Sequence, residues 1–417
     1  MKKFSVLVLG IILLFVTACS NSAISTSKNT KSNPDDGSNK ETETIKIGMT
    51  SAVTGPYSEY GEGNKRGVEL AIEKWNENGG INGKKIEVEI LDDQLVPDKA
   101  ANNIQQLLAD PEIVAIIGPA GSGPGLATVP ITEAKGMVHM NIVPQTIEVT
   151  YPNGTDQAPR KNVFSFALQN DVEANVLGEF AGEHWEKVGL LHESTAYGKS
   201  GMDLIANILE KDFNKKPVAR EEYNQGVSDM TSQLSKIKNA GAEVVVVVGL
   251  GADLANIKKG MDRLGLDVPL VATNGALSLP YLEGAGDLVL GTIGSMIGAL
   301  GKDPLSPEAQ EFADAYKEKY GVDRYWGNDE NNPQLFMSLN VANAYDGANV
   351  LFEALKNAES TKSEDIIKAL ESIQDFKGVN ATYSFSETKH HAISEEALDL
   401  FEYVKEGDKI KLAPYKK

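Results

Sequence analysis

The chain has 417 residues, a formal net charge of −19 at pH 7 and a single cysteine. A chain of this length has room for two domains of ordinary size. The acidic balance argues against nucleic acid as a partner, because no basic stripe is present to displace counterions from phosphates. One cysteine cannot form an internal disulfide, so the packing of apolar side chains must hold the fold together.

The N-terminus has the pattern of an export signal that ends at the cysteine. An apolar run at residues 4–15 has the length of a signal-peptide core and is short for a membrane span. It ends in VTAC at residues 16–19, which resembles a bacterial lipobox. We therefore expect residues 1–18 to be a lipoprotein signal peptide and Cys19 to carry the lipid, because two acyl chains on one atom anchor a protein stably. The alternative is an ordinary signal peptide in which the cysteine is a coincidence.

A polar segment follows the cysteine. Residues 19–44 are rich in Ser, Asn, Thr and Lys and contain almost no large apolar side chain. They cannot bury enough surface to offset chain entropy, so we expect a lipidated, disordered tether. A flexible segment of about 25 residues has a typical reach of roughly 25–30 Å, which would lift a folded body clear of the lipid headgroups. The rest of the sequence predicts no membrane-spanning helix.

The body alternates strands with helices from about residue 45 onward. In chain order we expect a strand at 45–50, a helix at 68–75, a strand at 86–91, a helix at 100–108, a strand at 113–117, a helix at 126–134 and a strand at 137–142. The run at 113–117 is apolar throughout, as in strands that are buried on both faces of a parallel sheet. This alternation is typical of a doubly wound α/β domain.

The same alternation begins again near Val163. We expect strands at 163–168, 188–192, near 218, and at 244–248, 268–272 and 288–293, with helices at 176–185, 202–209, 230–237 and 255–264 between them. Long helices at 307–320, 334–358 and 363–373 and strands at 382–385 and 400–404 complete the chain. Two successive α/β series predict two lobes, but the sequence does not show where the chain crosses between them.

A glycine-rich segment at 118–125 is the strongest candidate for a functional turn. It follows a buried strand and opens a helix, but Leu126 occupies the third glycine position of a dinucleotide fingerprint, and Ala120 and Pro124 replace the glycines of a nucleophile elbow. Ser122 would present a hydroxyl beside free backbone N–H groups at the positive end of a helix, which suits a carboxylate. The alternative is that Ser122 only caps the helix.

The histidines give no sign of catalysis or metal binding. The chain has five, and none lies in a recognisable triad or metal-ligand spacing, so we expect no enzyme, no metal and no cofactor. His390 and His391 are adjacent and would point to opposite sides of an extended strand, so we expect a surface turn there.

A series of short motifs covers the N-terminal part of the body. The motifs are IKIG at 45–48, TGPYSEYG at 54–61, GVELA at 67–71, NGGINGK at 78–84 and an aspartate pair at 92–93. The series resembles the leucine/isoleucine/valine-binding protein family, the substrate-binding proteins of branched-chain and related ABC importers. The likeness extends over essentially the whole body.

This resemblance implies the architecture of the body. It implies two doubly wound, Rossmann-like α/β lobes joined by a three-strand hinge, the type I periplasmic binding protein-like fold, which closes on its ligand by hinge bending. The first lobe would comprise residues 45–168 and about 297–385. The second lobe would comprise residues 169–296 and about 386–417.

The resemblance also implies a ligand site between the lobes. In this family a serine after the third strand and a hydroxyl residue after the fourth hold the ligand's carboxylate, and the second lobe supplies aromatic side chains. The matching positions are Tyr60, Ser122, Gly123, Val143, Gln145, Thr146, Tyr197, Leu250 and Asn274.

Two of these positions depart from the family pattern. The usual Thr-x-Pro segment reads IVPQT at 142–146, so either Gln145 or Thr146 is the partner of Ser122. Asn274 stands where the family has the acid that pairs with an amino acid's ammonium. Unless Asp253 substitutes for that acid, we expect poor binding of leucine and a ligand that lacks a free ammonium.

The sequence therefore predicts a bacterial, Gram-positive solute-binding lipoprotein, anchored on the extracytoplasmic face of the cell membrane. It would act as a monomer and deliver a small amino acid-like, amide or carboxylate ligand to an ABC permease. One alternative is a sensory protein of the same fold that reports its ligand to a membrane partner. A second alternative is an amidase or esterase that uses Ser122.

Overall fold

The structure is a computed structural model that describes residues 44–326 and 335–416. The predicted signal peptide, Cys19 and almost all of the predicted tether lie outside the described residues. Among the residues that are described, no helix is both long and apolar enough to cross a membrane.

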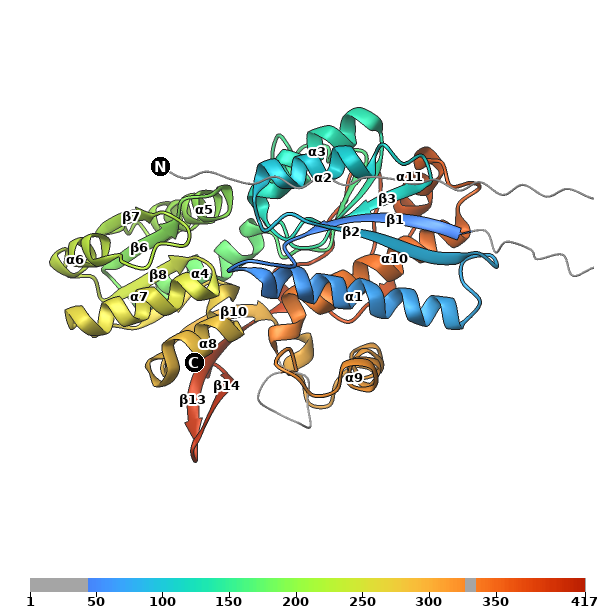
Figure 1. Cartoon of the computed structure of the whole chain (residues 1–417). Helices are drawn as coiled ribbons and strands as arrows, with labels where there is room; N and C mark the ends of the chain where they lie inside the picture. The colour runs from blue at the N-terminus through green and yellow to red at the C-terminus, as the bar shows by residue number, and fades with distance from the viewer. Residues whose placement is uncertain (1–43, 327–334, 417) are drawn as a thin grey trace, which may run out of the picture. The chain divides into compact units, whose positions relative to one another are not determined.

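The first sheet has five parallel strands in the order β2-β1-β3-β4-β5. Figure 1 labels β1, β2 and β3 of this sheet. The strands are β1 (Thr44–Ser51), β2 (Lys85–Asp92), β3 (Ile113–Ile117), β4 (Val138–Asn141) and β5 (Val163–Ser165). The alternation of side chains in β3 explains the helices on both faces. Ile117 faces a core shared with α1 (Ser58–Glu77), whereas Ile116 packs toward α2 (Pro97–Leu107) and α3 (Ser122–Lys135).

The second sheet has seven strands in the order β14-β13-β10-β9-β8-β6-β7. Its parallel strands are β6 (Val188–Glu193), β7 (Ala219–Tyr223), β8 (Val244–Val248), β9 (Leu270–Ala272) and β10 (Ile293–Ile297), and an antiparallel pair, β13 (Leu398–Glu406) and β14 (Lys409–Pro414), extends it beyond β10.

The five valines of β8 belong to two different cores. Val246 packs with the helices α4 (Asn170–His184) and α5 (Ala196–Asp212). Val245 and Val247 pack on the other face, with α6 (Thr231–Asn239), α7 (Gly251–Leu264) and α8 (Leu279–Ala285). A strand that is apolar at every position therefore lies between two helical layers, as the sequence predicted for such runs.

The chain passes between the two sheets three times. It leaves the first sheet after β5 for α4, and it returns after β10 to elements that pack on the first sheet. These elements are α9 (Pro307–Tyr320), α10 (Asn343–Asn357), α11 (Ser363–Glu371), β11 (Phe376–Lys377) and β12 (Thr382–Tyr383). The chain then enters β13. The lobe boundaries implied above remain a prediction about which residues move together.

Three predictions from the sequence were wrong in detail. The strand expected at 288–293 is instead β10 at Ile293–Ile297, because Gly291 has a φ of +75° and turns the chain within the apolar run. The helix expected at 334–358 is interrupted, since a π-helical turn at Ser338–Ala342 precedes α10. His390 lies fully buried rather than in a surface turn, and its Nδ1 is 2.9 Å from the backbone oxygen of Val163.

Helix α1 approaches the π-helical turn at Ser338–Ala342 closely because it has a glycine, Gly67, at the point of contact. A Cβ atom on Gly67 would lie 2.2 Å from the backbone oxygen of Val341, which no real Cβ atom tolerates. Two helical segments thus meet backbone to backbone on the face of the first sheet.

We expect Gly67→Ala to lower the free energy of unfolding by about 1–3 kcal/mol, the usual cost of overpacking a core. Glu77→Ala, at an exposed position of the same helix, should change it by less than about 0.5 kcal/mol. Urea unfolding of the two variants tests this. Equal stability of Gly67→Ala and the wild-type protein would show that the two segments separate without cost.

Candidate ligand-binding site

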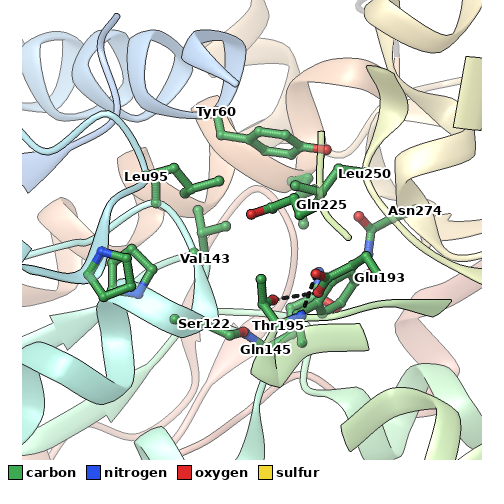
Figure 2. A pocket seen from close by; sticks show the side chains of 17 residues that line it. Tyr60, Leu95, Ser122, Val143, Gln145, Glu193, Thr195, Gln225, Leu250 and Asn274 are labelled. Atoms are coloured by element: carbon green, nitrogen blue, oxygen red, sulfur yellow. Dashed lines mark hydrogen bonds between the residues drawn. The ribbon is translucent and has the colours of Figure 1, made fainter. Parts of the chain in front are cut away.

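A cavity of about 120 Å³ lies at the carboxyl ends of strands from both sheets (Figure 2). It is lined by Tyr60, Leu95, Pro97, Ala120, Gly121, Ser122, Gly123, Pro124, Val143, Gln145, Glu193, Thr195, Tyr197, Gln225, Leu250, Asn274 and Leu339. Most of these residues stand in the loops, or in the first helical turns, that follow β1, β2, β3, β4, β6, β7, β8 and β9. Ligands of open α/β sheets bind at this edge, outside the carboxyl ends of the strands.

The cavity brings together all the predicted ligand-binding residues except Thr146. Thr146 is buried beside the cavity, and its backbone N–H donates to the Ser122 hydroxyl oxygen at 3.2 Å. Asp253 does not line the cavity either. Its carboxylate accepts hydrogen bonds from the Tyr57 hydroxyl at 3.3 Å and from the Gly226 N–H at 3.1 Å, so Asp253 does not take the place of the missing acid.

Ser122 is the first residue of α3, but its side chain does not cap the helix. Its Oγ instead accepts hydrogen bonds from the backbone N–H groups of Gln145, at 3.1 Å, and Thr146, at 3.2 Å. Both candidate partners of Ser122 therefore bind it through the backbone. Because the oxygen already accepts two hydrogen bonds, the hydroxyl proton is the part of the group that is left for a ligand.

Glu193 is the acidic side chain among the residues that line the cavity, and the sequence analysis did not select it. Its carboxylate accepts hydrogen bonds from the backbone N–H groups of Thr195 at 2.6 Å and Gly198 at 2.7 Å, at the start of α5. Figure 2 shows its bonds to Thr195. The positive end of a helix therefore stabilises this charge.

A buried polar network closes the second-sheet side of the cavity around Asn274. The Glu173 carboxylate, on α4, accepts hydrogen bonds from the Asn274 backbone N–H at 2.8 Å, from Asn274 Nδ2 at 3.1 Å and from Ser295 Oγ at 2.6 Å. The groups around Gln145 set the orientation of its amide. In that orientation Nε2 donates to Glu173 at 3.2 Å and to the Leu168 backbone oxygen at 3.3 Å, and Oε1 accepts from Asn274 Nδ2 at 2.8 Å.

Burial raises the pKa of the Glu173 carboxyl group. Removal from water raises the pKa of its carboxyl group to about 7, against the opposing effect of the hydrogen bonds from Ser295 and Asn274. The side chain is almost completely buried and stands one layer behind the cavity wall.

Some of the missed residues carried a signal in the sequence and others did not. Glu193 and Thr195 are polar residues at the end of β6, and Gln225 follows β7, so the rule that sites lie at strand ends would have found them. Leu339 lies within a helical segment, and Glu173 lies within α4, where no local pattern distinguishes a buried acid from a solvated one.

The fold and cavity define a class of protein: two α/β sheets with helices on both faces and a cavity where their strand ends meet. The family model for periplasmic binding proteins matches residues 44–408, so the chain belongs to that family. The predicted relationship and fold class are thereby confirmed.

Similar proteins agree with this assignment. The chain is 27% identical over 349 residues to Leu/Ile/Val-binding protein homolog 1 of Brucella abortus, which covers 82% of this chain and 86% of the relative. A periplasmic binding protein type 1 from Bordetella pertussis is 55% identical, with a TM-score of 0.87, over 89% of this chain and 100% of that chain. A branched-chain amino acid transporter substrate binding protein from Streptococcus pneumoniae, solved in complex with isoleucine, is 24% identical with a TM-score of 0.73, over 89% and 100% of the two chains.

The raised pKa of Glu173 makes stability depend on pH in a defined direction. The folded protein holds this proton more tightly than the unfolded chain, so the contribution of Glu173 to stability is present below pH 4.5 and is lost as pH rises through about 7. We expect the unfolding free energy of the wild-type protein to fall by about 2–3 kcal/mol more than that of Glu173→Gln between roughly pH 5 and pH 8.

Denaturant unfolding at the two pH values measures this difference. Glu210→Gln, at an exposed position of α5, is the matched control and should keep the wild-type pH dependence. If Glu173→Gln also keeps it, Glu173 is not the group responsible.

Proposed function

We propose that the protein is an extracytoplasmic solute-binding lipoprotein that captures a small amino acid-like, amide or carboxylate ligand between two lobes and delivers it to an ABC permease. One observation carries the proposal. Ser122 is the first residue of α3, and its hydroxyl lines a cavity at which strand ends from both sheets converge. The backbone N–H groups of Gln145 and Thr146 hold this hydroxyl in place. Such a group donates a hydrogen bond to an acceptor of the ligand, and the helix N-terminus favours negative charge on that acceptor.

The polar groups of the cavity argue against a ligand with a free ammonium group. Asn274 carries no charge, and the Glu193 carboxylate is already bound by the first N–H groups of α5. Leaving one charge of a buried ion pair without its partner costs on the order of 3–5 kcal/mol, which is about two to three and a half decades in affinity. An uncharged amide avoids this cost, and a carboxylate meets the Ser122 hydroxyl and the positive end of α3.

The remaining walls suit an apolar part of the ligand. Leucine, valine, proline and tyrosine contribute eight of the seventeen residues of the lining. They include Leu95, Val143, Tyr197 and Leu250. An apolar body with one or two polar ends is therefore the chemistry that the cavity accommodates. The named ligand of the pneumococcal neighbour, isoleucine, has such a body but also carries an ammonium group.

The hydrolase alternative finds no support in the arrangement of the cavity. A nucleophilic serine needs a general base within hydrogen-bonding reach. The residues that line the cavity include neither a histidine nor a lysine, and the Ser122 oxygen accepts hydrogen bonds from two backbone N–H groups. Ligand binding explains this geometry directly.

We expect calorimetric titration of the purified protein to give weaker than micromolar affinity for L-leucine. The analogue 2-hydroxy-4-methylpentanoate, which keeps the skeleton and the carboxylate but replaces the ammonium with a hydroxyl, should bind more tightly. Ser122→Ala should weaken its binding about 10- to 100-fold, because a hydrogen bond to a charged group is lost. Ser372→Ala, on the surface at the end of α11, should leave binding unchanged. Micromolar or tighter binding of leucine would contradict the proposed ligand class.

The membrane anchor is a separate part of the proposal and rests on Cys19. We expect Cys19→Ala to abolish incorporation of labelled palmitate and to release the protein from the membrane fraction, because the acyl chains supply the membrane affinity. Ser20→Ala is the matched control and should remain anchored. Retained labelling of Cys19→Ala would exclude Cys19 as the lipidation site.

A further inference from the structure

The Asn274 side-chain amide can contact a ligand only through its oxygen, because its nitrogen is already hydrogen-bonded within the protein. Its Nδ2 carries two protons, and this nitrogen lies 3.1 Å from each carboxylate oxygen of Glu173 and 2.8 Å from Gln145 Oε1. Both protons are thereby used. Among the described residues none donates to Oδ1, and Asn274 is a wall of the cavity (Figure 2).

The buried carboxylate behind Asn274 determines this orientation. An ionised carboxylate only accepts hydrogen bonds, so every polar group that faces it must present a donor. Glu173 meets four such donors: the backbone N–H and Nδ2 of Asn274, Ser295 Oγ and Gln145 Nε2. Reversing the Asn274 amide would place its oxygen against the carboxylate, which buried acceptors do not tolerate.

We propose that Glu173 is a positioning residue that sets the hydrogen-bonding polarity of the cavity, by holding the Asn274 amide so that Oδ1 is offered to the ligand as an acceptor. Ser122 offers a donor from the first-sheet side, and Asn274 offers an acceptor from the second-sheet side. The ligand is then selected for an uncharged O–H or N–H donor close to its carboxylate or carbonyl group. This selection rests on the proposed function, whereas the orientation of Asn274 does not.

The protonation of Glu173 controls the same orientation. A protonated carboxyl group donates one hydrogen bond, so one of the two amides that face it, Asn274 or Gln145, must then turn its oxygen toward it. Burial raises the pKa of Glu173 to about 7, so this change falls near neutral pH. The titratable group that faces Glu173 from α5 is Tyr197, whose own pKa is raised by burial and further by the charges of Glu173 and Glu193. From the other elements the facing groups are Gln145, Asn274 and Ser295, which do not titrate.

Three acids with one carbon skeleton test the proposal. They are 2-hydroxy-4-methylpentanoate, with a donor at C2, 4-methyl-2-oxopentanoate, with only an acceptor there, and L-leucine, with an ammonium group. At about pH 8 the wild-type protein should bind the hydroxy acid at least about tenfold more tightly than the oxo acid, the value of one hydrogen bond. Leucine should bind more weakly than the hydroxy acid.

In Glu173→Gln we expect this preference to reverse, because the introduced amide donates where the Glu173 carboxylate accepted, and the Asn274 amide turns its N–H toward the ligand. Glu179→Gln, at an exposed position of the same helix, is the matched control. It makes the same chemical change away from Asn274, so it should keep the wild-type ratio. A ratio of hydroxy acid to oxo acid affinity that is the same in Glu173→Gln and in the wild-type protein overturns the proposal.

A measurement without any ligand decides the role of Glu173 separately. In the wild-type protein at about pH 8, both Nδ2 protons of Asn274 should exchange slowly with solvent by NMR, with Asn274→Asp identifying the signals. At about pH 5.5, or in Glu173→Gln, one of them should become exchangeable. If Glu173→Gln does not fold, the wild-type pH series provides the same comparison. Equal protection under all conditions refutes the positioning role. Failure of all three acids to bind the wild-type protein refutes the proposed ligand class instead.

Discussion

The cavity depends on one buried negative charge. The Glu173 carboxylate is almost fully removed from water, and the contacts that act on it in the described structure are hydrogen bonds rather than a basic side chain. Such a charge persists only where several donors converge on it. Here the donors come from Asn274 and Ser295, on the side of the second sheet, and from Gln145, which follows β4 of the first sheet. Satisfying one carboxylate thus places two amides beside the cavity and fixes which of their atoms can face a ligand.

The other polar groups of the cavity also have hydrogen-bond partners within the protein, which limits how each of them can bind a ligand. Ser122 accepts two backbone hydrogen bonds and keeps its proton. The Glu193 carboxylate accepts hydrogen bonds from the first N–H groups of α5. The resulting surface is a donor at one side, an acceptor at the other and apolar walls between them. Selectivity of this kind comes from the cost of burying an unmatched polar group, which exceeds the gain from matching one.

The cavity lies at the strand ends of both sheets, so its polar groups come from both of them. Loops from both sheets line one cavity. We propose that a ligand that satisfies both sides favours the arrangement in which they approach each other. In the proposed function, a permease recognises that arrangement, and a lipid at Cys19 keeps the protein at the membrane surface. Confinement to a surface raises the effective concentration of the receptor there without any added contact.

The sequence by itself determined the two α/β series, because a strand that is buried on both faces, such as Val244–Val248, is apolar throughout, and amphipathic helices show their period. The glycine-rich turn after an apolar strand pointed to Ser122, whereas Tyr197 and Asn274 were expected from the family resemblance, and all three line the cavity. It misplaced the strand after Gly291, where a single turn within an apolar run decides the register. Only the tertiary structure decided the role of Glu173. Its partners Asn274 and Ser295 are 101 and 122 residues away in the chain, and helical periodicity carries no record of contacts so distant.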